Sequence, residues 1–410
     1  MMKSIIKSEY SYRMVYSGRY KHPKAVSCSA VQVQNNINAN IFNLFVFLLF
    51  MCLPVFYSVA QPFKIPSENH YNKHPIFLAS SSALSGPTAK LGTRLNQGAQ
   101  AYFDRINDSG GIYGRQILLK IVDDGYEPFK TLKNTQKFIK DNNVFALFNY
   151  VGTPTTSVVF PLIKNKPLPF LMPFTGAEFL RKPITKNIFN LRASYYQEVE
   201  AQIEYLVKEE KITKIGLLIQ ADEFGDAVEE GYINSLNKYG IELVVTTRYR
   251  RNTQNIDLAL SVLKKNNVEA IAFVGTYEPF AELINTAATQ KFTPFFTTVS
   301  FISSHDLFSR IKQNSRVLVS EVMPEPETCT LSLCQQFIND MKKAGKHYTD
   351  QVQFEGYLNA YLFVEVAKQC GENLSQRCFL NKIKTFSFDF GGITANFSPE
   401  NHQGLNNVYL

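Results

Sequence analysis

Residues 76–124 read IFLASSSALSGPTAKLGTRLNQGAQAYFDRINDSGGIYGRQILLKIVDD, and this stretch decides the fold class. It opens on Ile76–Ala79, a short apolar run typical of a buried strand. Apolar side chains then recur at the spacing of one helical face, at Leu95, Ala99, Tyr102, Phe103 and Ile106. Polar residues and glycines at 107–111 end that helix, and Ile117–Val122 resumes as a strand. The sequence therefore predicts a strand–helix–strand unit.

The same alternation continues to residue 172, and a second series follows it. Val144–Phe148 is apolar throughout, which suits a parallel strand buried on both faces. Further strands are expected at 170–172, 215–219, 241–247, 270–274 and 295–298, with helices after Pro128 and at 155–164, 197–210, 226–238, 256–266 and 280–290. A mostly helical segment follows Pro324. This pattern predicts an α/β protein with two doubly wound parallel-sheet lobes, which face each other across a ligand-binding cleft.

Composition places the chain among globular proteins and argues against nucleic-acid binding. Hydrophobic residues make up 45% of the 410 residues and charged residues 19%, which lies outside the range of disordered chains. The formal net charge is +8, but residues 1–60 supply six basic side chains and only one acidic side chain. The remainder carries 37 basic and 34 acidic residues, and this near balance predicts no basic surface for nucleic acid.

Residues 41–60 read IFNLFVFLLFMCLPVFYSVA, carry no charged side chain and follow a basic segment. Ser58-Val59-Ala60 supplies the small residues that signal peptidase requires, so residues 1–60 are expected to be a signal peptide cleaved after Ala60. The alternative is an uncleaved anchor, because about 20 apolar residues can span a bilayer. On either interpretation residues 61–410 are exported, which predicts a periplasmic location.

Four cysteines remain after the signal segment. An even number of thiols in an oxidising compartment suggests disulfides, with three possible connectivities. The short spacings favour the local pairs Cys329–Cys334 and Cys370–Cys378. Zinc binding is the competing interpretation, but neither spacing is C-x-x-C and no histidines cluster nearby.

The sequence lacks the motifs of common enzyme classes. It contains no P-loop, no G-x-G-x-x-G after the first strand, no G-x-S-x-G and no H-E-x-x-H. Asp123 and Asp124 could form an acid/base or metal-binding pair, but adjacent carboxylates at a strand end more often cap the following loop. The sequence therefore predicts a binding protein without catalysis, metal or cofactor.

Small hydroxylated residues and glycine follow the strands of the first lobe. Residues 80–87 follow the first strand, and Gly152, Thr153 and Thr155 follow Val144–Phe148. Gly152 allows close backbone approach, and the hydroxyls lie near unpaired helix N–H groups, an arrangement that suits a carboxylate. The alternative is ordinary capping of the helix by its threonines.

Aromatic residues follow two strands of the second lobe. Phe224 comes after the strand at 215–219, and Tyr277 after the strand at 270–274. A ring in such a position can cover the apolar part of a ligand. The alternative is that each ring packs under its own loop.

Several motifs together resemble one known family. They are Ser82-Ala83-Leu84-Ser85-Gly86-Pro87, Gly98-Ala99-Gln100-Ala101-Tyr102-Phe103, Ile106-Asn107 with Gly110-Gly111-Ile112-Tyr113-Gly114-Arg115, Arg192-Ala193-Ser194-Tyr195, Asp222-Glu223-Phe224-Gly225 and Phe397-Ser398-Pro399-Glu400-Asn401-His402-Gln403-Gly404. In combination they resemble the class I periplasmic solute-binding proteins of ABC importers. More closely, they resemble the branched-chain amino-acid (Leu/Ile/Val) binding group, over nearly all of residues 74–410.

The resemblance implies a clamp whose two lobes, joined by three crossings, close on a small solute and then dock on a permease. Lobe 1 would comprise residues 74–191 and 325–390, and lobe 2 residues 192–324 and 391–410. The ligand-binding positions carried over are Ser85, Leu91, Gly152, Thr153, Thr155, Phe174, Thr175, Ala177, Tyr195, Phe224, Tyr277 and Ser300. The implied partners are an amino acid or related small carboxylate or amide and an ABC permease in the inner membrane, with no nucleic acid. A monomer is expected.

One departure from the family concerns the ligand's amine. Amino-acid binders of the family place a carboxylate after the strand that matches Phe295–Thr298, but here Val299-Ser300-Phe301 follows. A buried ammonium without a partner is costly, so an apolar or aromatic carboxylate or a neutral solute fits at least as well, unless Glu278 or Glu355 substitutes.

Two other functions stay open at this stage. One is a ligand sensor tethered by residues 41–60. The other is an exported α/β enzyme that uses Ser300 or the Asp123–Asp124 pair.

Overall fold

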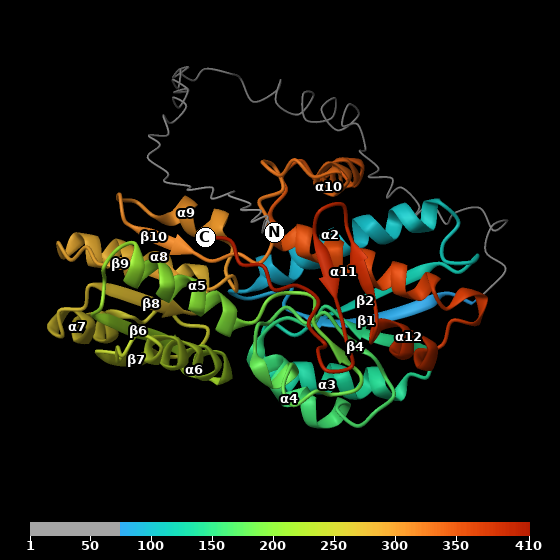
Figure 1. The fold of residues 1–410 in the computed structure, drawn as a ribbon, viewed down its shortest axis with the longest axis horizontal. Coiled ribbons are helices and arrows are strands. Elements are labelled where there is room, and N and C mark those ends of the chain that lie inside the picture. The colour runs from blue at the N-terminus through green and yellow to red at the C-terminus, as the bar shows by residue number, and fades with distance from the viewer. Residues whose placement is uncertain (1–73) are drawn as a thin grey trace, which may run out of the picture. The chain divides into compact units, whose positions relative to one another are not determined.

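The computed structural model describes residues 74–410, which form two lobes built on separate parallel sheets (Figure 1). Lobe 1 has the strand order β2-β1-β3-β4-β5, and lobe 2 has the order β10-β9-β8-β6-β7. The strands of lobe 1 are β1 (Ile76–Ser82), β2 (Ile117–Asp123), β3 (Val144–Phe148), β4 (Phe170–Leu171) and β5 (Ile188–Phe189). Those of lobe 2 are β6 (Ile215–Gln220), β7 (Val245–Tyr249), β8 (Ala270–Val274), β9 (Phe295–Thr298) and β10 (Val317–Val319). The predicted fold class is confirmed.

Helices cover both faces of the lobe 1 sheet, with α3 and α4 on one side and α2 and α11 on the other (Figure 1). The helices of lobe 1 are α2 (Ala89–Asp108), α3 (Pro128–Lys140), α4 (Thr153–Ile163), α10 (Ser332–Lys343), α11 (Gln351–Lys368) and α12 (Gln376–Ile383), with the short 3₁₀ helices η1 (Glu178–Leu180) and η2 (Gly371–Asn373). Glycines allow α2 and α11 to approach closely. A Cβ on Gly98 would lie 1.7 Å from the Gln353 carbonyl oxygen, and one on Gly356 would lie 1.8 Å from that of Leu95.

The sheet of lobe 2 is buried on both faces. Its helices are α5 (Tyr195–Lys208), α6 (Glu223–Asn237), α7 (Asp257–Lys265), α8 (Tyr277–Thr289) and α9 (Ser304–Arg310). Leu217 and Ile219 of β6 belong to one apolar cluster, whereas Leu218 belongs to another. Because side chains alternate between the two faces of a strand, these two clusters are the two layers of the core.

One strand lies further along the chain than the sequence predicts. The apolar residues at 241–247 predict a strand, but β7 begins at Val245. The Ile241 N–H donates to the Leu236 carbonyl, which closes the end of α6, and Ile241 and Leu243 then pack beside the lobe 2 core. Their apolarity therefore reflects a packed connection, not strand pairing.

The lobe assignment of the C-terminal residues also differs from the sequence-based expectation. Residues 391–405 pack on lobe 1, not on lobe 2, because the apolar side chains Ile393, Ala395, Phe397 and Leu405 are buried in the lobe 1 core. Within this segment β12 (Thr394–Asn396) pairs antiparallel with β11 (Ser387–Asp389).

Three chain segments cross between the lobes. The first runs through residues 190–194, between β5 and α5, and the second through 320–324, after β10. The C-terminal segment pairs with both, since Asn190 forms a bridge with Gln403 and Glu321 forms one with Tyr409. The crossings are thus tied to one another by backbone hydrogen bonds.

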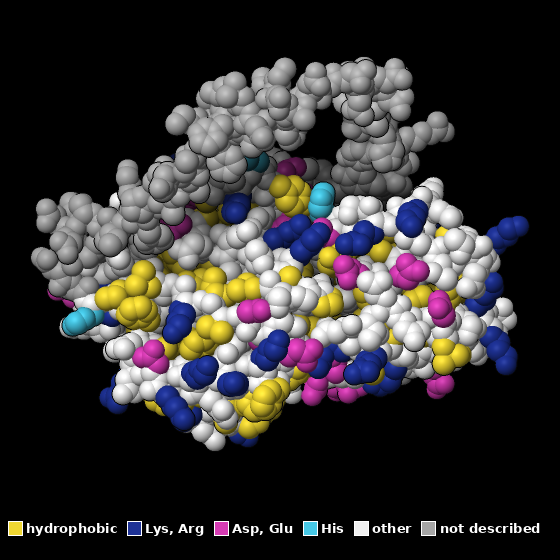
Figure 2. Space-filling view, turned by 180° about the vertical axis from the view of Figure 1, so that it is seen from behind, with side chains coloured by type: hydrophobic (Ala, Val, Ile, Leu, Met, Phe, Trp, Pro, Cys, Tyr) yellow, Lys and Arg dark blue, Asp and Glu magenta, His cyan; other side chains and the backbone are white. Residues whose placement is uncertain are grey.

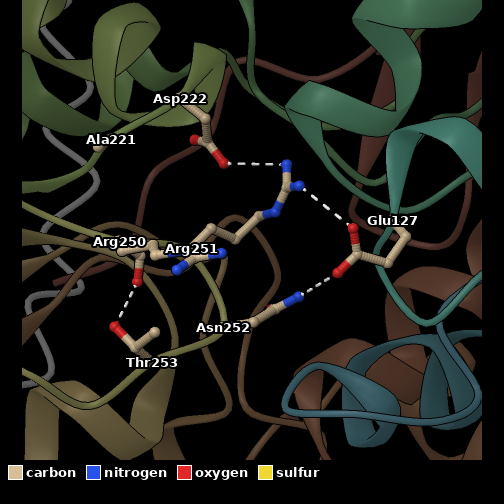
Figure 3. Close-up of a pocket in the computed structure, with 7 residues that line it drawn as sticks. All are labelled: Glu127, Ala221, Asp222, Arg250, Arg251, Asn252 and Thr253. Carbon is tan, nitrogen blue, oxygen red and sulfur yellow. Dashed lines mark hydrogen bonds and ion pairs between the residues drawn. The ribbon is translucent and has the colours of Figure 1, made fainter.

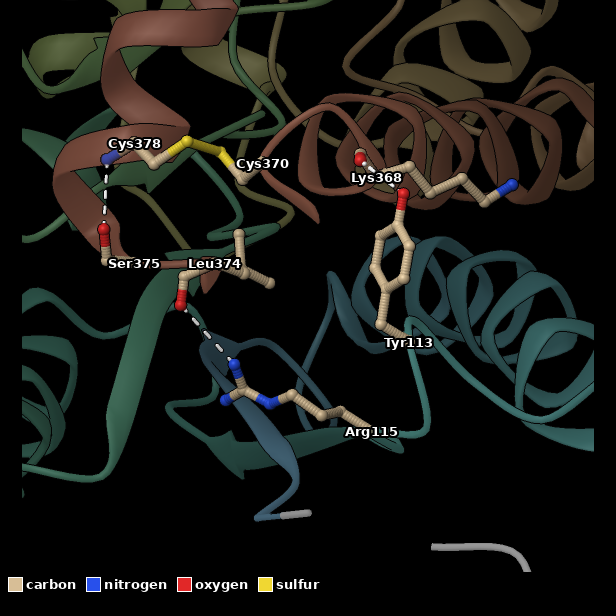
Figure 4. Close-up of a disulfide and its surroundings, with 7 residues drawn as sticks. All are labelled: Tyr113, Arg115, Lys368, Cys370, Leu374, Ser375 and Cys378. Atoms are coloured by element: carbon tan, nitrogen blue, oxygen red, sulfur yellow. Dashed lines mark hydrogen bonds between the residues drawn. A yellow bond between two sulfur atoms is a disulfide. The ribbon is translucent and has the colours of Figure 1, made fainter. Parts of the chain in front are cut away.

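Both disulfides lie in the C-terminal part of lobe 1, as Cys329–Cys334 and Cys370–Cys378. Figure 4 shows the second of these beside the loop that follows α2. The Tyr113 hydroxyl donates to the Lys368 carbonyl at 3.0 Å, and the Arg115 guanidinium donates to the Leu374 carbonyl at 3.5 Å. The Gly-Gly-Ile-Tyr-Gly-Arg motif therefore holds the connection between α11 and α12.

Charged side chains of both signs are interspersed on the face shown in Figure 2. Several pair locally: Arg248, for example, lies 2.6 Å from a carboxylate oxygen of both Asp226 and Glu229. That face carries no single-sign patch of described residues.

Candidate ligand-binding site

The two lobes meet through aromatic side chains, here called the aromatic seam: Tyr126, Phe174, Tyr195, Phe224 and Phe301. Phe301 of lobe 2 lies at its centre, with ring centroids 5.7 Å from Tyr126 and 5.6 Å from Phe174 of lobe 1. Its ring also lies 4.9 Å from Phe224. Each of these rings is at most 1% exposed, so the lobes are closed on one another.

Gly152 makes room for the seam on the lobe 1 side. Its φ of +101° lies in the region that favours glycine, and a Cβ would lie 2.2 Å from a ring carbon of Tyr126. The close backbone approach expected at Gly152 thus serves the Tyr126 ring in the closed form.

The threonines of this region have different roles. Thr153 and Thr175 place their hydroxyl oxygens 2.8 Å apart. Burial raises the pKa of the neighbouring Tyr195, while the Arg192 charge and the hydroxyls of Thr175 and Thr153 oppose that rise. Thr155, in contrast, donates its hydroxyl to the Gly152 and Val151 carbonyls of its own helix start. Thr155 therefore caps no helix N–H group: Gly152 is the N-cap residue of α4, and no described side chain makes a cap hydrogen bond there.

Three further residues of lobe 1 were expected to bind the ligand: Leu91, Ala177 and Ser85. They lie at different distances from the aromatic seam. Leu91 is 2% exposed and belongs to the same apolar cluster as the seam. The Ala177 N–H donates to the Thr175 hydroxyl at 3.2 Å, so this backbone shapes the loop. Ser85 is exposed and donates its hydroxyl to Asp123 at 2.6 Å, away from the seam cluster.

Asp123 and Asp124 fix the loops at the end of β2. Asp123 accepts the backbone N–H groups of Leu84, Ser85 and Gly125 at 2.8 to 3.1 Å. Asp124 accepts the Ser81 hydroxyl and the Tyr126 N–H, so it also positions the Tyr126 ring of the seam. Both carboxylates have the loop-capping role that the sequence favoured.

Tyr277 does not join the aromatic seam. It packs in the other layer of the lobe 2 core, and its hydroxyl donates to Glu278 at 3.3 Å. The amine of Lys90, from lobe 1, lies 5.4 Å from the ring centroid, and the Arg310 guanidinium lies 5.2 Å from it. Tyr277 and Phe224 therefore lie in different layers of lobe 2, and the expected cover of a ligand by Tyr277 stays a prediction.

A charged cluster lies against the seam and comprises Arg192, Glu198, Ser300, Glu321 and Glu355. Arg192, on the first crossing, is 1% exposed and stacks over the Phe174 ring at 4.4 Å. Its Nη2 donates to the Ser300 hydroxyl. Ser300 in turn donates its N–H to Glu198 at 2.7 Å and its hydroxyl to the same carboxylate at 2.9 Å. Ser300 thus links the guanidinium to a carboxylate.

Three carboxyl groups lie around the Arg192 guanidinium: those of Glu198 and Glu355 are buried, and that of Glu321 is half-buried. Burial raises the pKa of Glu355 to about 7, although Arg192 opposes the rise. Burial also raises the pKa of Glu198, and it raises that of Glu321 well above its ordinary value. Burial acts to lower the pKa of Arg192, but Glu355 and Glu198 outweigh it, and the pKa of Arg192 is raised. The guanidinium therefore stays charged.

Arg192, Ser300, Glu321 and Glu355 line a narrow space together with Phe174 and Val352. This space does not admit a water molecule. Two nitrogen atoms of Arg192, Nε and Nη1, have no hydrogen-bond partner among the described residues. The sequence analysis did not assign Tyr126 or Phe301 to the site, although each follows a strand end, β2 and β9 respectively. It also missed Glu198 and Glu321, and Glu355 was only one of two candidate acids.

A second space, the rim cavity, has a volume of about 360 Å³ and lies between Glu127 of lobe 1 and residues 221–222 and 250–253 of lobe 2 (Figure 3). Arg251 lies 3.3 Å from Glu127 and 3.4 Å from Asp222, and the Asn252 amide donates to Glu127 at 2.7 Å. A polar network thus bridges the lobes at this cavity.

Further ion pairs bridge the lobes from α2. Lys90 lies 2.5 Å from Asp306 of lobe 2, and Arg94 lies 2.9 Å from the same carboxylate. Arg94 also pairs with Asp350 at 2.8 Å. Closure therefore combines an apolar interior with ion pairs nearer the solvent.

Residues 74–410 contain neither a membrane-spanning helix nor a cluster of metal ligands. None of the helices in this range combines the length and apolarity needed to cross a bilayer. The same residues contain no group of three or more His, Cys, Asp or Glu side chains placed to hold a metal ion.

The chain is similar to proteins named for branched-chain amino acids. It is 26% identical over 205 residues to a Leu/Ile/Val-binding protein of Rhizobium johnstonii, and 26% identical over 196 residues to a Leu/Ile/Val-binding protein homolog of Brucella melitensis. These alignments cover 49% and 47% of this chain and 54% and 52% of the relatives. The chain thus spans about half the length of the curated relatives it matches.

Solved structures extend this similarity over most of the described residues. A possible leucine/isoleucine/valine-binding protein from Rhodopirellula baltica matches with a TM-score of 0.78 and 29% identity, covering 84% of this chain and 95% of that one. A branched-chain amino acid ABC transporter protein from Thermus thermophilus with bound valine shares the fold, with a TM-score of 0.73, 18% identity and coverage of 82% and 92%. The family model described as periplasmic binding protein matches residues 75–410. The family resemblance is thereby confirmed, and the chain belongs to the periplasmic binding protein family.

Proposed function

We propose that this protein is the extracytoplasmic substrate-binding component of an ABC importer, and that it captures a small solute by closure of its lobes. The observation that carries the proposal is the contact between the lobes, where the aromatic seam surrounds a buried guanidinium and buried carboxyl groups. Polar groups of this kind are costly to bury without partners, so their presence at a closing interface supports a ligand-binding role.

Access to the site requires the lobes to separate. The space beside Arg192 does not admit water in the closed form, whereas small-molecule pockets commonly measure about 300–1,000 Å³. Hinge motion at the three crossings would expose the rings of both lobes, and closure on a solute would exclude water again.

The proposed ligand is an amino acid or a related small carboxylate or amide. The names of the relatives support this class, as do the groups at the site. No acid follows Thr298, but Glu198 of α5, Glu321 of the second crossing and Glu355 of α11 bring carboxyl groups to the same region.

Export by residues 1–60 is part of the proposal, and this segment lies outside the described residues. Sequencing the N-terminus of the protein recovered from the periplasm would test it. A mature chain beginning at Gln61 is expected. A protein retained in the membrane with residues 41–60 intact would instead support the tethered sensor.

The function itself is tested by a thermal-shift screen of the purified protein against amino acids, aliphatic and aromatic carboxylates, amides and polyamines. A ligand present at 100 times its dissociation constant adds about 2.7 kcal/mol to the free energy of unfolding, which is visible as a shift in Tm. A shift with an amino acid, carboxylate or amide is expected. If none of these compounds shifts Tm, the proposed ligand class is wrong.

A further inference from the structure

Arg192 is held in place on two sides, and two of its nitrogen atoms have no hydrogen-bond partner in the part of the chain that the structure describes. The Phe174 ring lies under the guanidinium plane at 4.4 Å, and the Ser300 hydroxyl accepts from Nη2. Because Ser300 is itself bound twice by Glu198, this arrangement fixes the guanidinium. The two nitrogens left without a hydrogen-bond partner, Nε and Nη1, belong to a side chain that lines the narrow space between the lobes.

Glu355 lines the same space from α11. Its carboxylate lies 3.7 Å from Nε of Arg192, too far for a hydrogen bond, and accepts none from the described residues. The side chain is buried, with the residue 3% exposed. Unused donors of Arg192 and unused acceptors of Glu355 therefore lie side by side at the closing interface.

We infer that Arg192 and Glu355 together select the polar end of the solute, which carries a hydrogen-bond acceptor for Arg192 beside an N–H donor for Glu355. The inference rests on the proposed function, and it names the residues that decide the specificity of the binding site. An α-amino acid and a primary amide share this arrangement of acceptor and donor.

Solutes with only one of these groups fit the pair less well. A simple carboxylate would place a negative charge beside Glu355 and Glu198, and a simple amine would leave the Arg192 donors unpaired next to a second cation. Each case leaves a buried polar group uncompensated, which is the main way in which a site rejects a close analogue.

The test uses two matched sets of probes that differ only at the polar end. One set is L-leucine, 4-methylpentanamide, 4-methylpentanoate and 3-methylbutylamine, and the other is L-phenylalanine, 3-phenylpropanamide, 3-phenylpropanoate and 2-phenylethylamine. Calorimetry measures the dissociation constant of each probe for the wild-type protein. In each set, we expect the amino acid or the amide to bind at least about tenfold more tightly than the acid and the amine. Comparing the dissociation constants of the amino acid and the amide within each set shows which of these two compound classes the site prefers.

Glu355→Gln is expected to lose that preference. It should weaken binding of the preferred probe by about tenfold or more, while leaving the simple carboxylate unchanged or improved. Arg192→Lys, which keeps the charge, should weaken the amino acid, the amide and the carboxylate but not the amine. Glu278→Gln is the matched control, because Glu278 pairs with Arg310 outside the charged cluster, and it should keep the wild-type preference.

The outcomes separate this inference from the proposed function. A purely structural role for Glu355 would weaken all probes of a set by the same factor, and an unchanged preference in Glu355→Gln would overturn the inference alone. Equal binding of the acid and the amino acid or amide by the wild-type protein would also overturn it. If no amino acid, carboxylate or amide of the thermal-shift screen binds the wild-type protein either, the proposed function fails and the inference fails with it.

Discussion

The interior of the lobe contact and its rim hold the closed form in different ways. In the interior, Phe301 packs among rings of both lobes, and Arg192 is 1% exposed. At the rim, the side chains of Arg251 and Glu127 are 23% and 42% exposed and lie beside a cavity of about 360 Å³. Apolar burial and buried charge have large energetic effects, whereas exposed ion pairs have small ones. The interior should therefore set stability and specificity, and the rim should only adjust them.

The largest effect is expected in the interior, from Phe301→Ala. Loss of a fully packed phenylalanine costs about 3 kcal/mol in a core, so the variant should lower the free energy of unfolding of the unliganded protein by a similar amount. Phe129→Ala is the control, since Phe129 is 75% exposed. Chemical denaturation of both variants measures the difference. Equal stability of the two would mean that Phe301 is not packed between the lobes in solution.

Gly152→Ala tests the lobe 1 side of the seam. The new Cβ would lie 2.2 Å from the Tyr126 ring at a φ of +101°, and we expect a loss of about 2 kcal/mol beyond that of Gly110→Ala. Gly110 has a nearly identical φ of +99°, and a Cβ there would meet no atom within 4 Å, so it isolates the contact with Tyr126. Thermal unfolding compares the two variants. Matching Tm values would show that the Tyr126 ring moves aside without a loss of stability.

The pH dependence of stability tests the buried charge. Arg192, Arg181 and Glu198 face Glu355, and burial raises the pKa of Glu355 from 4.5 to about 7. The unfolded chain releases this proton at lower pH than the folded chain does, so this group lowers stability as pH rises from about 4.5 to 7, with no further change above that range. Relative to Glu355→Gln, the wild-type protein should lose about 2 kcal/mol between pH 5 and 7. Parallel stability curves for the two proteins would contradict the raised pKa.

The smallest effect is expected at the rim. Glu127→Gln removes the ion pair with Arg251 that joins the lobes, and it should change ligand affinity by less than about 1 kcal/mol and reduce its dependence on salt. Asp226→Asn is the control, because it removes an exposed ion pair with Arg248 within lobe 2. Calorimetric titrations at low and high salt measure both. A tenfold loss of affinity in Glu127→Gln would place the rim among the major determinants of binding.

The strand and helix pattern of the sequence predicted eight of the ten strands of the two sheets, but not β5 and β10, which have only two and three residues. It was less informative where an apolar segment packs without pairing, as at Ile241 and Leu243. Residues 391–405, which include the second strand of the C-terminal hairpin, were assigned to lobe 2, since local pattern does not show which core buries Phe397.

The candidate site was predictable only where strand ends bring residues together. Phe174, Tyr195 and Phe224 were expected from family positions and lie in the seam. Phe301 and Tyr126 were missed because their contacts form between lobes, and no local spacing reports such a contact. Glu355 lies in the middle of a helix that is buried along its length, so its sequence neighbours give no sign that it faces the site.

The pairing of α2 with α11 has a consequence for the order of folding. Lobe 2 comes from one continuous stretch of chain, whereas lobe 1 combines residues before 190 with residues after 324. During synthesis, which proceeds from the N-terminus, the first half of lobe 1 exposes the face of α2 that α11 later covers. Lobe 2 can therefore complete its core while the face of α2 that α11 covers is still exposed.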